Sequence, residues 1–249
     1  PAPGGPRAPG ADAATRGPVS NVYTLPARAA RPLARGEASG MDKGLFSNAG
    51  AEANEAAIKI ARLHGHARNI DVPAIICMEK AFHGRTLATL TATGNRKVQA
   101  GFEPLVRGFV RAPYDDIDAI ETIARNNPGI AAILVEPIQG EGGIRIPAPD
   151  YLARLRAICD RHDWLLMLDE IQTGNGRTGS LFHYQQRGLL PDVVTLAKGL
   201  GNGVPIGACL PRGQAAELMR PGNPGPTFGR HPVACPAGRA PPNARAQPT

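Results

Sequence analysis

Short runs of consecutive apolar residues recur along the middle of the chain, each bounded by polar residues, glycine or proline. Such runs predict buried parallel strands. We expect strands at residues 74–78, 109–112, 130–135, 165–168, 193–197 and 206–210. Segments with helical periodicity lie among them, at residues 47–65, 115–127 and 149–162, and Gly65 is the predicted C-cap of the first. Strands that alternate with helices predict an α/β fold, with a mainly parallel sheet covered by helices on both faces.

This pattern is missing at both ends of the chain. Residues 1–20 contain too few apolar side chains to form a core, and from Pro221 onward the sequence is dominated by Pro, Gly, Ala and Arg. We therefore predict a mostly disordered or irregular segment at residues 1–40, a folded domain over 41–215 and an irregular tail over 216–249. The chain begins with Pro1 rather than Met, so we also expect residues upstream of it.

The net charge of +7 comes from the ends of the chain. Residues 41–210 hold 18 Lys and Arg against 18 Asp and Glu, so the predicted folded part is neutral. A nucleic-acid-binding protein is not expected, because its basic residues should lie on the folded surface. No apolar run approaches the length of a membrane span, so no membrane partner is expected. The four cysteines lack metal-ligand spacing, which favours reduced thiols in a cytoplasmic protein and no metal site.

Two of the predicted strands deliver charged residues to the same edge of the sheet. Residues 165–168 lead into Asp169, and residues 193–197 lead into Lys198. A lysine in a dry site has a lowered pKa and can attack a carbonyl carbon, while a buried aspartate can keep a heterocyclic nitrogen protonated. Pyridoxal phosphate (PLP) uses this arrangement as an electron sink. The spacing alone fits a surface lysine and a loop-capping acid equally well.

Other segments add candidate ligand contacts. Gly50 lies at the start of the first predicted helix, where free backbone N–H groups favour a phosphate, although an ordinary amphipathic helix also explains this sequence. Phe82 follows a strand and could stack on a flat ring or pack in the core. Arg85 could bind a carboxylate or form a surface ion pair. Glu136 and Glu141 lie beside glycines at a strand end, which indicates either a site or two exposed loop acids.

Two nucleotide-binding motifs match only in part. Residues 174–179 fit GxGxxG, but no apolar strand ends in an acid at the distance that a dinucleotide site requires. The run Leu165–Glu170 resembles a Walker B strand, but the chain contains no GxxxxGK[ST] loop. A dinucleotide-binding enzyme and an ATPase are therefore not expected.

Together, five segments resemble the class III (subgroup II) PLP-dependent aminotransferases, most closely the acetylornithine type. They are Asn48–Glu55, Ala81–Thr86, Glu136–Gly142, Leu168–Gly174 and Leu196–Leu200, in the order typical of that family. The resemblance covers about residues 45–210. It implies the large domain of a type I PLP-dependent transferase, with the small domain largely missing. It also implies a cytoplasmic homodimer in arginine biosynthesis that transfers an amino group from N-acetylornithine, or a related ω-amino donor, to 2-oxoglutarate.

The resemblance also implies a role for each matching residue in cofactor binding. Lys198 would hold PLP covalently and move a proton. Asp169 would bind the pyridinium nitrogen and Gln172 would lie near the ring hydroxyl. Phe82 would stack on the ring, and the backbone N–H groups of Gly50 and Ala51 would bind the phosphate.

Three further positions resemble residues that bind substrate or complete the site. Arg85 would bind a substrate carboxylate. Glu141 resembles the family's switch glutamate, which pairs with an arginine of the C-terminal domain. Thr227 resembles a phosphate ligand that is donated across a dimer interface.

Departures from the family pattern leave a second hypothesis open. Ala49 replaces the usual serine, and the small domain with its arginine is not recognisable. The chain also jumps between Gly40 and Leu45 across a segment of the family's active site. A non-catalytic remnant or partner subunit, binding PLP weakly or not at all, is therefore the alternative to the enzyme. Ornithine, succinylornithine and 4-aminobutyrate remain alternative donors.

Overall fold

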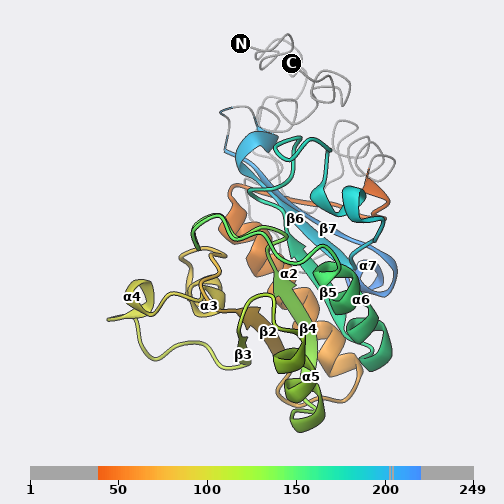
Figure 1. Cartoon of the computed structure of the whole chain (residues 1–249). Coiled ribbons are helices and arrows are strands. Elements are labelled where there is room, and N and C mark those ends of the chain that lie inside the picture. Colours follow the sequence, from red (N-terminus) through yellow and green to blue (C-terminus); the bar gives the residue numbers. More distant parts are fainter. Residues whose placement is uncertain (1–38, 202, 204, 220–249) are drawn as a thin grey trace.

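The computed structural model describes residues 39–201, 203 and 205–219, which form one seven-stranded sheet flanked by helices (Figure 1). The strand order is β1-β7-β6-β5-β4-β2-β3. The strands are β1 (Leu45–Ser47), β2 (Ala74–Met78), β3 (Phe109–Ala112), β4 (Ile130–Val135), β5 (Leu165–Asp169), β6 (Val193–Leu196) and β7 (Gly207–Pro211). The six predicted strands are present to within one residue at either end, whereas β1 was not predicted.

The sheet is mainly parallel, as expected. Strands β3, β2, β4, β5 and β6 are parallel neighbours, and β7 and β1 are added antiparallel at one edge. The parallel register pairs Leu168 with Val194 and Asp169 with Thr195. The carboxyl ends of β5 and β6 therefore lie side by side, and Lys198 follows only three residues after Thr195.

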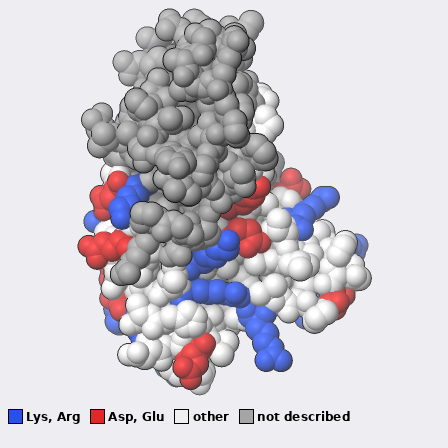
Figure 2. Space-filling view, turned by 180° about the vertical axis from the view of Figure 1, so that it is seen from behind, with Lys and Arg blue, Asp and Glu red and all other residues white. Residues whose placement is uncertain are grey.

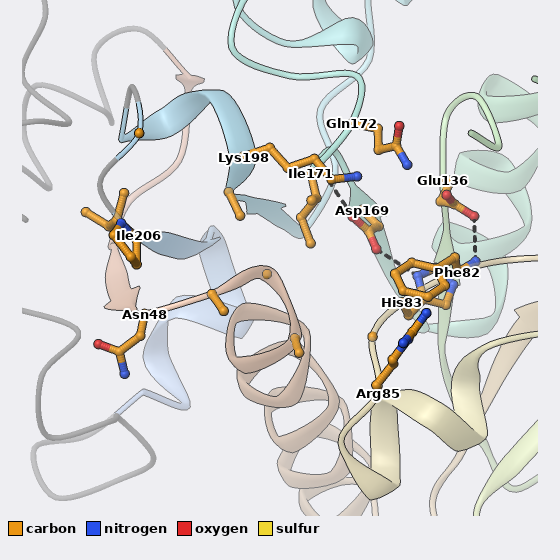
Figure 3. Close-up of a pocket in the computed structure, with 17 residues that line it drawn as sticks. Asn48, Phe82, His83, Arg85, Glu136, Asp169, Ile171, Gln172, Lys198 and Ile206 are labelled. Carbon is orange, nitrogen blue, oxygen red and sulfur yellow. Dashed lines mark hydrogen bonds and ion pairs between the residues drawn. The ribbon is translucent and has the colours of Figure 1, made fainter. Parts of the chain in front are cut away.

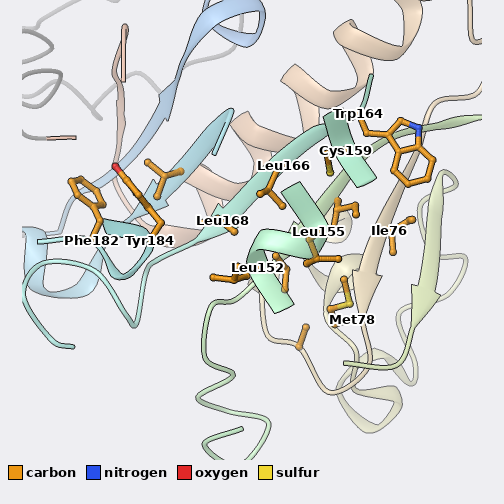
Figure 4. Packing of buried hydrophobic residues seen from close by; sticks show 14 of the residues in the cluster. Ile76, Met78, Leu152, Leu155, Cys159, Trp164, Leu166, Leu168, Phe182 and Tyr184 are labelled. Carbon is orange, nitrogen blue, oxygen red and sulfur yellow. The ribbon is translucent and has the colours of Figure 1, made fainter. Parts of the chain in front are cut away.

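Helices cover both faces of the sheet. The long helix α2 (Gly50–Ala67) lies on one face, and α5 (Ile117–Asn126) and α6 (Tyr151–His162) lie on the other (Figure 1). Successive side chains along each strand point to opposite faces of the sheet. In β2, Ile75 and Cys77 pack on the α2 side, while Ile76 and Met78 pack on the α6 side (Figure 4). The shorter elements α3 (Leu87–Ala92), α4 (Arg96–Gln99), α7 (Gly213–Glu217), η2 (His183–Arg187) and η3 (Lys198–Leu200) were not predicted.

Helix α2 continues past the glycine that was predicted to end it. Gly65 is buried within the helix, which ends at Ala67 with Arg68 as its C-cap. A Cβ atom at Gly65 would lie 2.4 Å from Cβ of Pro73 and 3.1 Å from Cβ of Ala131. The prediction of Gly65 as a C-cap is wrong, because this glycine permits close packing rather than a left-handed helix end.

The predicted domain limits fall close to the ends of the described chain. Ser39 is buried, and its carbonyl accepts a 2.7 Å hydrogen bond from the hydroxyl of Tyr184. Helix α7 runs to Glu217, two residues beyond the predicted limit. The rest of the two segments predicted to be irregular lies outside the described residues. Within the described part, no helix has both the length and the hydropathy that a membrane crossing requires.

Candidate active site

A cavity of about 520 Å³ opens where the carboxyl ends of β4, β5 and β6 meet the start of α2 (Figure 3). Open α/β sheets bind their ligands at this edge. Lys198 and Asp169, which were predicted to share one crevice, both line the cavity. Gly50, Ala51, Phe82, Gln172 and Arg85 line it as well.

Lys198 presents an amine to the cavity from a strained turn. It follows β6 with a backbone φ of +44°, a left-handed conformation that few residues other than glycine adopt. The side chain of Asn175 donates a 3.1 Å hydrogen bond to the carbonyl of Ala197, one residue earlier. Desolvation lowers the pKa of the Lys198 ammonium, and the charges of Asp169 and Glu141 oppose this shift. Among the described residues, its Nζ has no hydrogen-bond or salt-bridge partner.

Asp169 is a buried carboxylate that accepts three hydrogen bonds. The side-chain amide of Asn54 and ring atom Nδ1 of His83 each lie 2.8 Å from Oδ2. The backbone N–H of Ile171 donates to Oδ1 over 3.1 Å. These three contacts fix the orientation of the carboxyl group at the end of β5.

Helix α2 begins at the cavity with uncapped N–H groups. The N-cap residue Ala49 forms no side-chain cap, and Gly50 and Ala51 of the first turn line the cavity. Gly50 allows close approach, since a Cβ atom there would lie 2.7 Å from Cδ1 of Ile171. The positive end of the helix dipole and the free N–H groups make this corner of the cavity suitable for an anion such as phosphate.

Phe82 and Glu136 form the wall of the cavity beyond Asp169 (Figure 3). The backbone N–H of Phe82 donates a 3.1 Å hydrogen bond to Oε2 of Glu136, which fixes the half-buried ring. Burial raises the pKa of Glu136 to about 7, the charge of His83 opposes this shift, and the charge of Asp169 adds to it. On the same wall, a Cβ atom at Gly140 would lie 2.6 Å from Oε1 of Gln172, so the glycine makes room for that amide.

The remaining predicted residues have less contact with the cavity. Arg85 lines it with an exposed side chain. Glu141 is exposed and is not among the lining residues, although its charge acts on Lys198. Thr227 lies outside the described residues. The GxGxxG segment at residues 174–179 forms consecutive turns and opens no helix, so it lacks the helix N-terminus of a dinucleotide site.

Sequence reasoning gave no role to several buried polar residues that complete the site. Asn54 bridges Asp169 to β6, because its Oδ1 accepts a 2.7 Å hydrogen bond from the hydroxyl of Thr195. His83 contacts Asp169 directly. One signal was available for Asn54, since it is a polar residue on the buried face of a helix that is otherwise rich in alanine.

Comparison with known proteins identifies the family. A model of the class-III aminotransferases matches residues 21–242. The chain belongs to this family. This class-III aminotransferase is 59% identical over 217 residues to the acetylornithine aminotransferase of Nitrosomonas europaea, covering 87% of the chain and 55% of that relative. It is 50% identical to acetylornithine aminotransferase 1 of Bordetella parapertussis, with 89% and 56% covered. The chain thus spans about half the length of the curated relatives it matches.

Solved structures support the same assignment for this class-III aminotransferase. The ornithine aminotransferase of Toxoplasma gondii superposes with a TM-score of 0.88 at 34% identity, covering 94% of this chain and 56% of that one. A second structure of the Toxoplasma enzyme, described with partial occupancy of PLP at its active site, gives a TM-score of 0.84 at 36% identity, with 89% and 53% covered. The fold is that of the type I PLP-dependent transferases, as expected.

Proposed function

We propose that this chain binds PLP and serves transamination between N-acetylornithine and 2-oxoglutarate in arginine biosynthesis. The observation that carries the proposal is a partly desolvated amine, Lys198, lining the same cavity as the buried carboxylate of Asp169. The residues present fit the cofactor. A helix start suits its phosphate, a carboxylate suits its ring nitrogen, an aromatic ring suits its flat face and an amine suits its aldehyde.

PLP, when bound, would supply an electron sink for the negative charge that develops at the substrate carbon bearing the transferred amino group. Lys198 would hold the aldehyde of the cofactor through its amine and would move a proton to and from that carbon. The lowered pKa of Lys198 favours the neutral amine that both roles require. Asp169 would accept a hydrogen bond from the protonated ring nitrogen and would stabilise its positive charge.

Other residues that line the cavity would orient the cofactor and the substrate. The N–H groups of Gly50 and Ala51 would bind the phosphate at the start of α2, and Phe82 would stack on the ring. Gln172 would hydrogen-bond the ring hydroxyl. Arg85 would bind a substrate carboxylate with its planar guanidinium group. Glu141 as the switch glutamate and Thr227 as a phosphate ligand stay predictions.

The choice of donor follows the curated relatives. Eight curated relatives, which are 47–59% identical to the chain, are all acetylornithine aminotransferases. This agreement favours the acetylated donor over free ornithine.

We further propose that the chain acts as a cytoplasmic homodimer. The proposal rests on the family resemblance, which implies this assembly. Large apolar side chains that are exposed on the described surface, among them Leu87, Phe102, Ile144 and Ile146, are available for a subunit contact. Acidic and basic side chains are both distributed over the visible described surface (Figure 2).

Light scattering coupled to size-exclusion chromatography tests the homodimer. We expect the mass of two chains, and a monomer at micromolar concentration would contradict this assembly.

Borohydride trapping tests the role of Lys198. The chain is mixed with PLP, reduced with borohydride, digested and analysed by mass spectrometry. We expect a pyridoxyl adduct on Lys198, and none in Lys198→Ala. Lys59→Ala, which removes an exposed lysine from α2, is the matched control and should label like the wild type. Equal labelling of several surface lysines, or undiminished labelling of Lys198→Ala, would overturn the proposal.

A half-reaction separates the enzyme from a non-catalytic remnant. Chain loaded with PLP is mixed with N-acetylornithine, ornithine or 4-aminobutyrate, and conversion to the pyridoxamine form is followed by absorbance. The enzyme hypothesis expects the largest rate with N-acetylornithine and recovery of the aldehyde form on adding 2-oxoglutarate. A specific adduct on Lys198 without conversion by any donor would favour the remnant.

A further inference from the structure

The carboxylate of Asp169 has one oxygen that is fully occupied and one that is not. Oδ2 accepts both the Asn54 amide and the His83 ring nitrogen, which uses its two lone pairs. Among the described residues, Oδ1 accepts only the N–H of Ile171. Oδ1 therefore keeps the acceptor capacity that remains for a ligand in the cavity.

The two ring nitrogens of His83 have different surroundings. The side chain is fully buried, and Nδ1 lies 2.8 Å from Oδ2 of Asp169. The other ring nitrogen, Nε2, is buried and has no hydrogen-bond partner among the described residues. Nδ1 is therefore the ring atom that is placed to donate a hydrogen bond to the carboxylate.

The backbone around His83 is held from both sides. Its N–H donates a 3.0 Å hydrogen bond to the hydroxyl of Thr93, which in turn donates to the carbonyl of Gly84. Its carbonyl accepts a 2.8 Å hydrogen bond from Asn54. Arg111 on strand β3 fixes the Thr93 segment, donating to the carbonyls of Ala92 over 2.6 Å and Thr93 over 3.3 Å. Hydrogen bonds therefore hold the loop that places the imidazole next to Asp169.

We propose that His83 is a positioning residue for Asp169: its Nδ1–H holds Oδ2 so that Oδ1 meets the protonated ring nitrogen of the cofactor. This inference rests on the proposed function, since it assigns the partner of Oδ1. Without His83, Asn54 would be the only donor to Oδ2 among the described residues, so this oxygen would be held less firmly.

The first test measures the tautomer in cofactor-free protein. Nitrogen-15 labelling of histidine and NMR at neutral pH distinguish the protonated ring nitrogen from the bare one. We expect His83 to carry a proton on Nδ1, with its assignment made by the His83→Asn variant. A bare Nδ1 would overturn the inference, because it could not donate to Asp169.

The second test measures the Kd for PLP in matched variants. His83→Leu should raise Kd by about tenfold, because a hydrogen bond to a charged group is lost. His83→Asn, which keeps an N–H donor near the position of Nδ1, should raise it by no more than about twofold. His64→Leu is the control, since His64 is another buried histidine with one hydrogen-bonded ring nitrogen and lies near the far end of α2. It should lower Tm without changing Kd.

A variant pair at Thr93 tests the inference with the imidazole left in place. Thr93→Val removes the hydroxyl that holds the His83 backbone, and Thr93→Ser retains it. We expect a raised Kd in the first variant and near wild-type binding in the second. If His83→Leu lowers Tm but leaves the Kd for PLP within twofold of wild type, the role of His83 is structural only and the inference fails. Failure of the wild-type chain to bind PLP would instead refute the proposed function, while the NMR result would still decide the tautomer.

Discussion

Gly84 joins the segment that carries Phe82 and His83 to helix α3, and its conformation is costly for any other residue. Its φ is +137°, and a Cβ atom there would lie 2.5 Å from Oγ1 of Thr89 and 2.9 Å from Cβ of Ala51. We expect Gly84→Ala to lower the free energy of unfolding by roughly 2–4 kcal/mol, through backbone strain and overpacking. Urea unfolding measures this loss.

A second glycine separates the contributions of backbone strain and of overpacking to the loss of stability. Gly101 has a φ of +89° but nothing within 4 Å of its Cβ position. Gly101→Ala should therefore cost only the backbone strain, about 1 kcal/mol. Equal losses in the two variants would show that the contact with Ala51 contributes nothing to stability.

The sequence indicated Lys198 and Asp169 because each directly follows an apolar run, and that rule requires no knowledge of packing. It gave no role to Asn54 or His83. Asn54 contacts Asp169 across 115 residues of sequence, and His83 contacts it across 86. These contacts depend on how α2 and the loop before α3 are oriented against β5, which local periodicity does not encode.

Glu170 ties strand β5 to η2. Its buried carboxyl accepts hydrogen bonds from the N–H groups of His183 at 2.7 Å and Tyr184 at 2.9 Å, yet burial outweighs them and raises the pKa of Glu170 to about 7. The folded state therefore binds this proton more tightly than the unfolded state. Its contribution to stability is full below pH 4.5 and is lost as the pH rises to about 7.

Glu170→Gln should flatten this pH dependence. Glutamine has the shape of the protonated acid and does not ionise. We expect the wild type to lose on the order of 2 kcal/mol more stability than the variant between pH 5 and pH 8. Thermal unfolding across this pH range measures the difference. Parallel curves for the two proteins would contradict the assignment, while a common residual slope is expected because burial also raises the pKa of Glu136.

The parallel strands and long helices followed from periodicity, and the antiparallel edge did not. Strand β7 follows β6 after a connection too short for a crossover helix, so it returns antiparallel. Strand β1 has only three residues, too few for a periodic signal. Contacts between residues distant in sequence hold the short elements α3 and α4. Among them are hydrogen bonds from the Arg111 guanidinium to the carbonyls of residues 91–93.

Cofactor binding should stabilise the protein as a whole, because the residues that line the cavity come from α2, β5 and the segments that follow β2, β4 and β6. At a free PLP concentration 100 times the Kd, binding to the folded state alone adds about 2.7 kcal/mol to the free energy of unfolding. Urea unfolding with and without PLP measures this gain. Lys198→Ala should gain less at the same concentration, and an equal gain from inorganic phosphate would indicate anion binding only.

The order of the strands in the sheet could not be predicted from the sequence. Alternation of strands and helices predicts a parallel sheet but leaves open which strands are neighbours. Here β4 lies between β2 and β5, and β3 forms the edge. This order brings Glu136 at the end of β4 next to Asp169 at the end of β5, a proximity that no spacing along the chain reveals.

The left-handed backbone conformation of Lys198 lowers thermal stability at a position whose side chain the proposed chemistry requires. Glycine there would relieve the conformational strain, so Lys198→Gly should melt above Lys198→Ala by an amount corresponding to about 1 kcal/mol. Directed evolution that rewards only thermal survival would therefore discard this amine early, and a screen for hardier variants must include a check that PLP can still be captured.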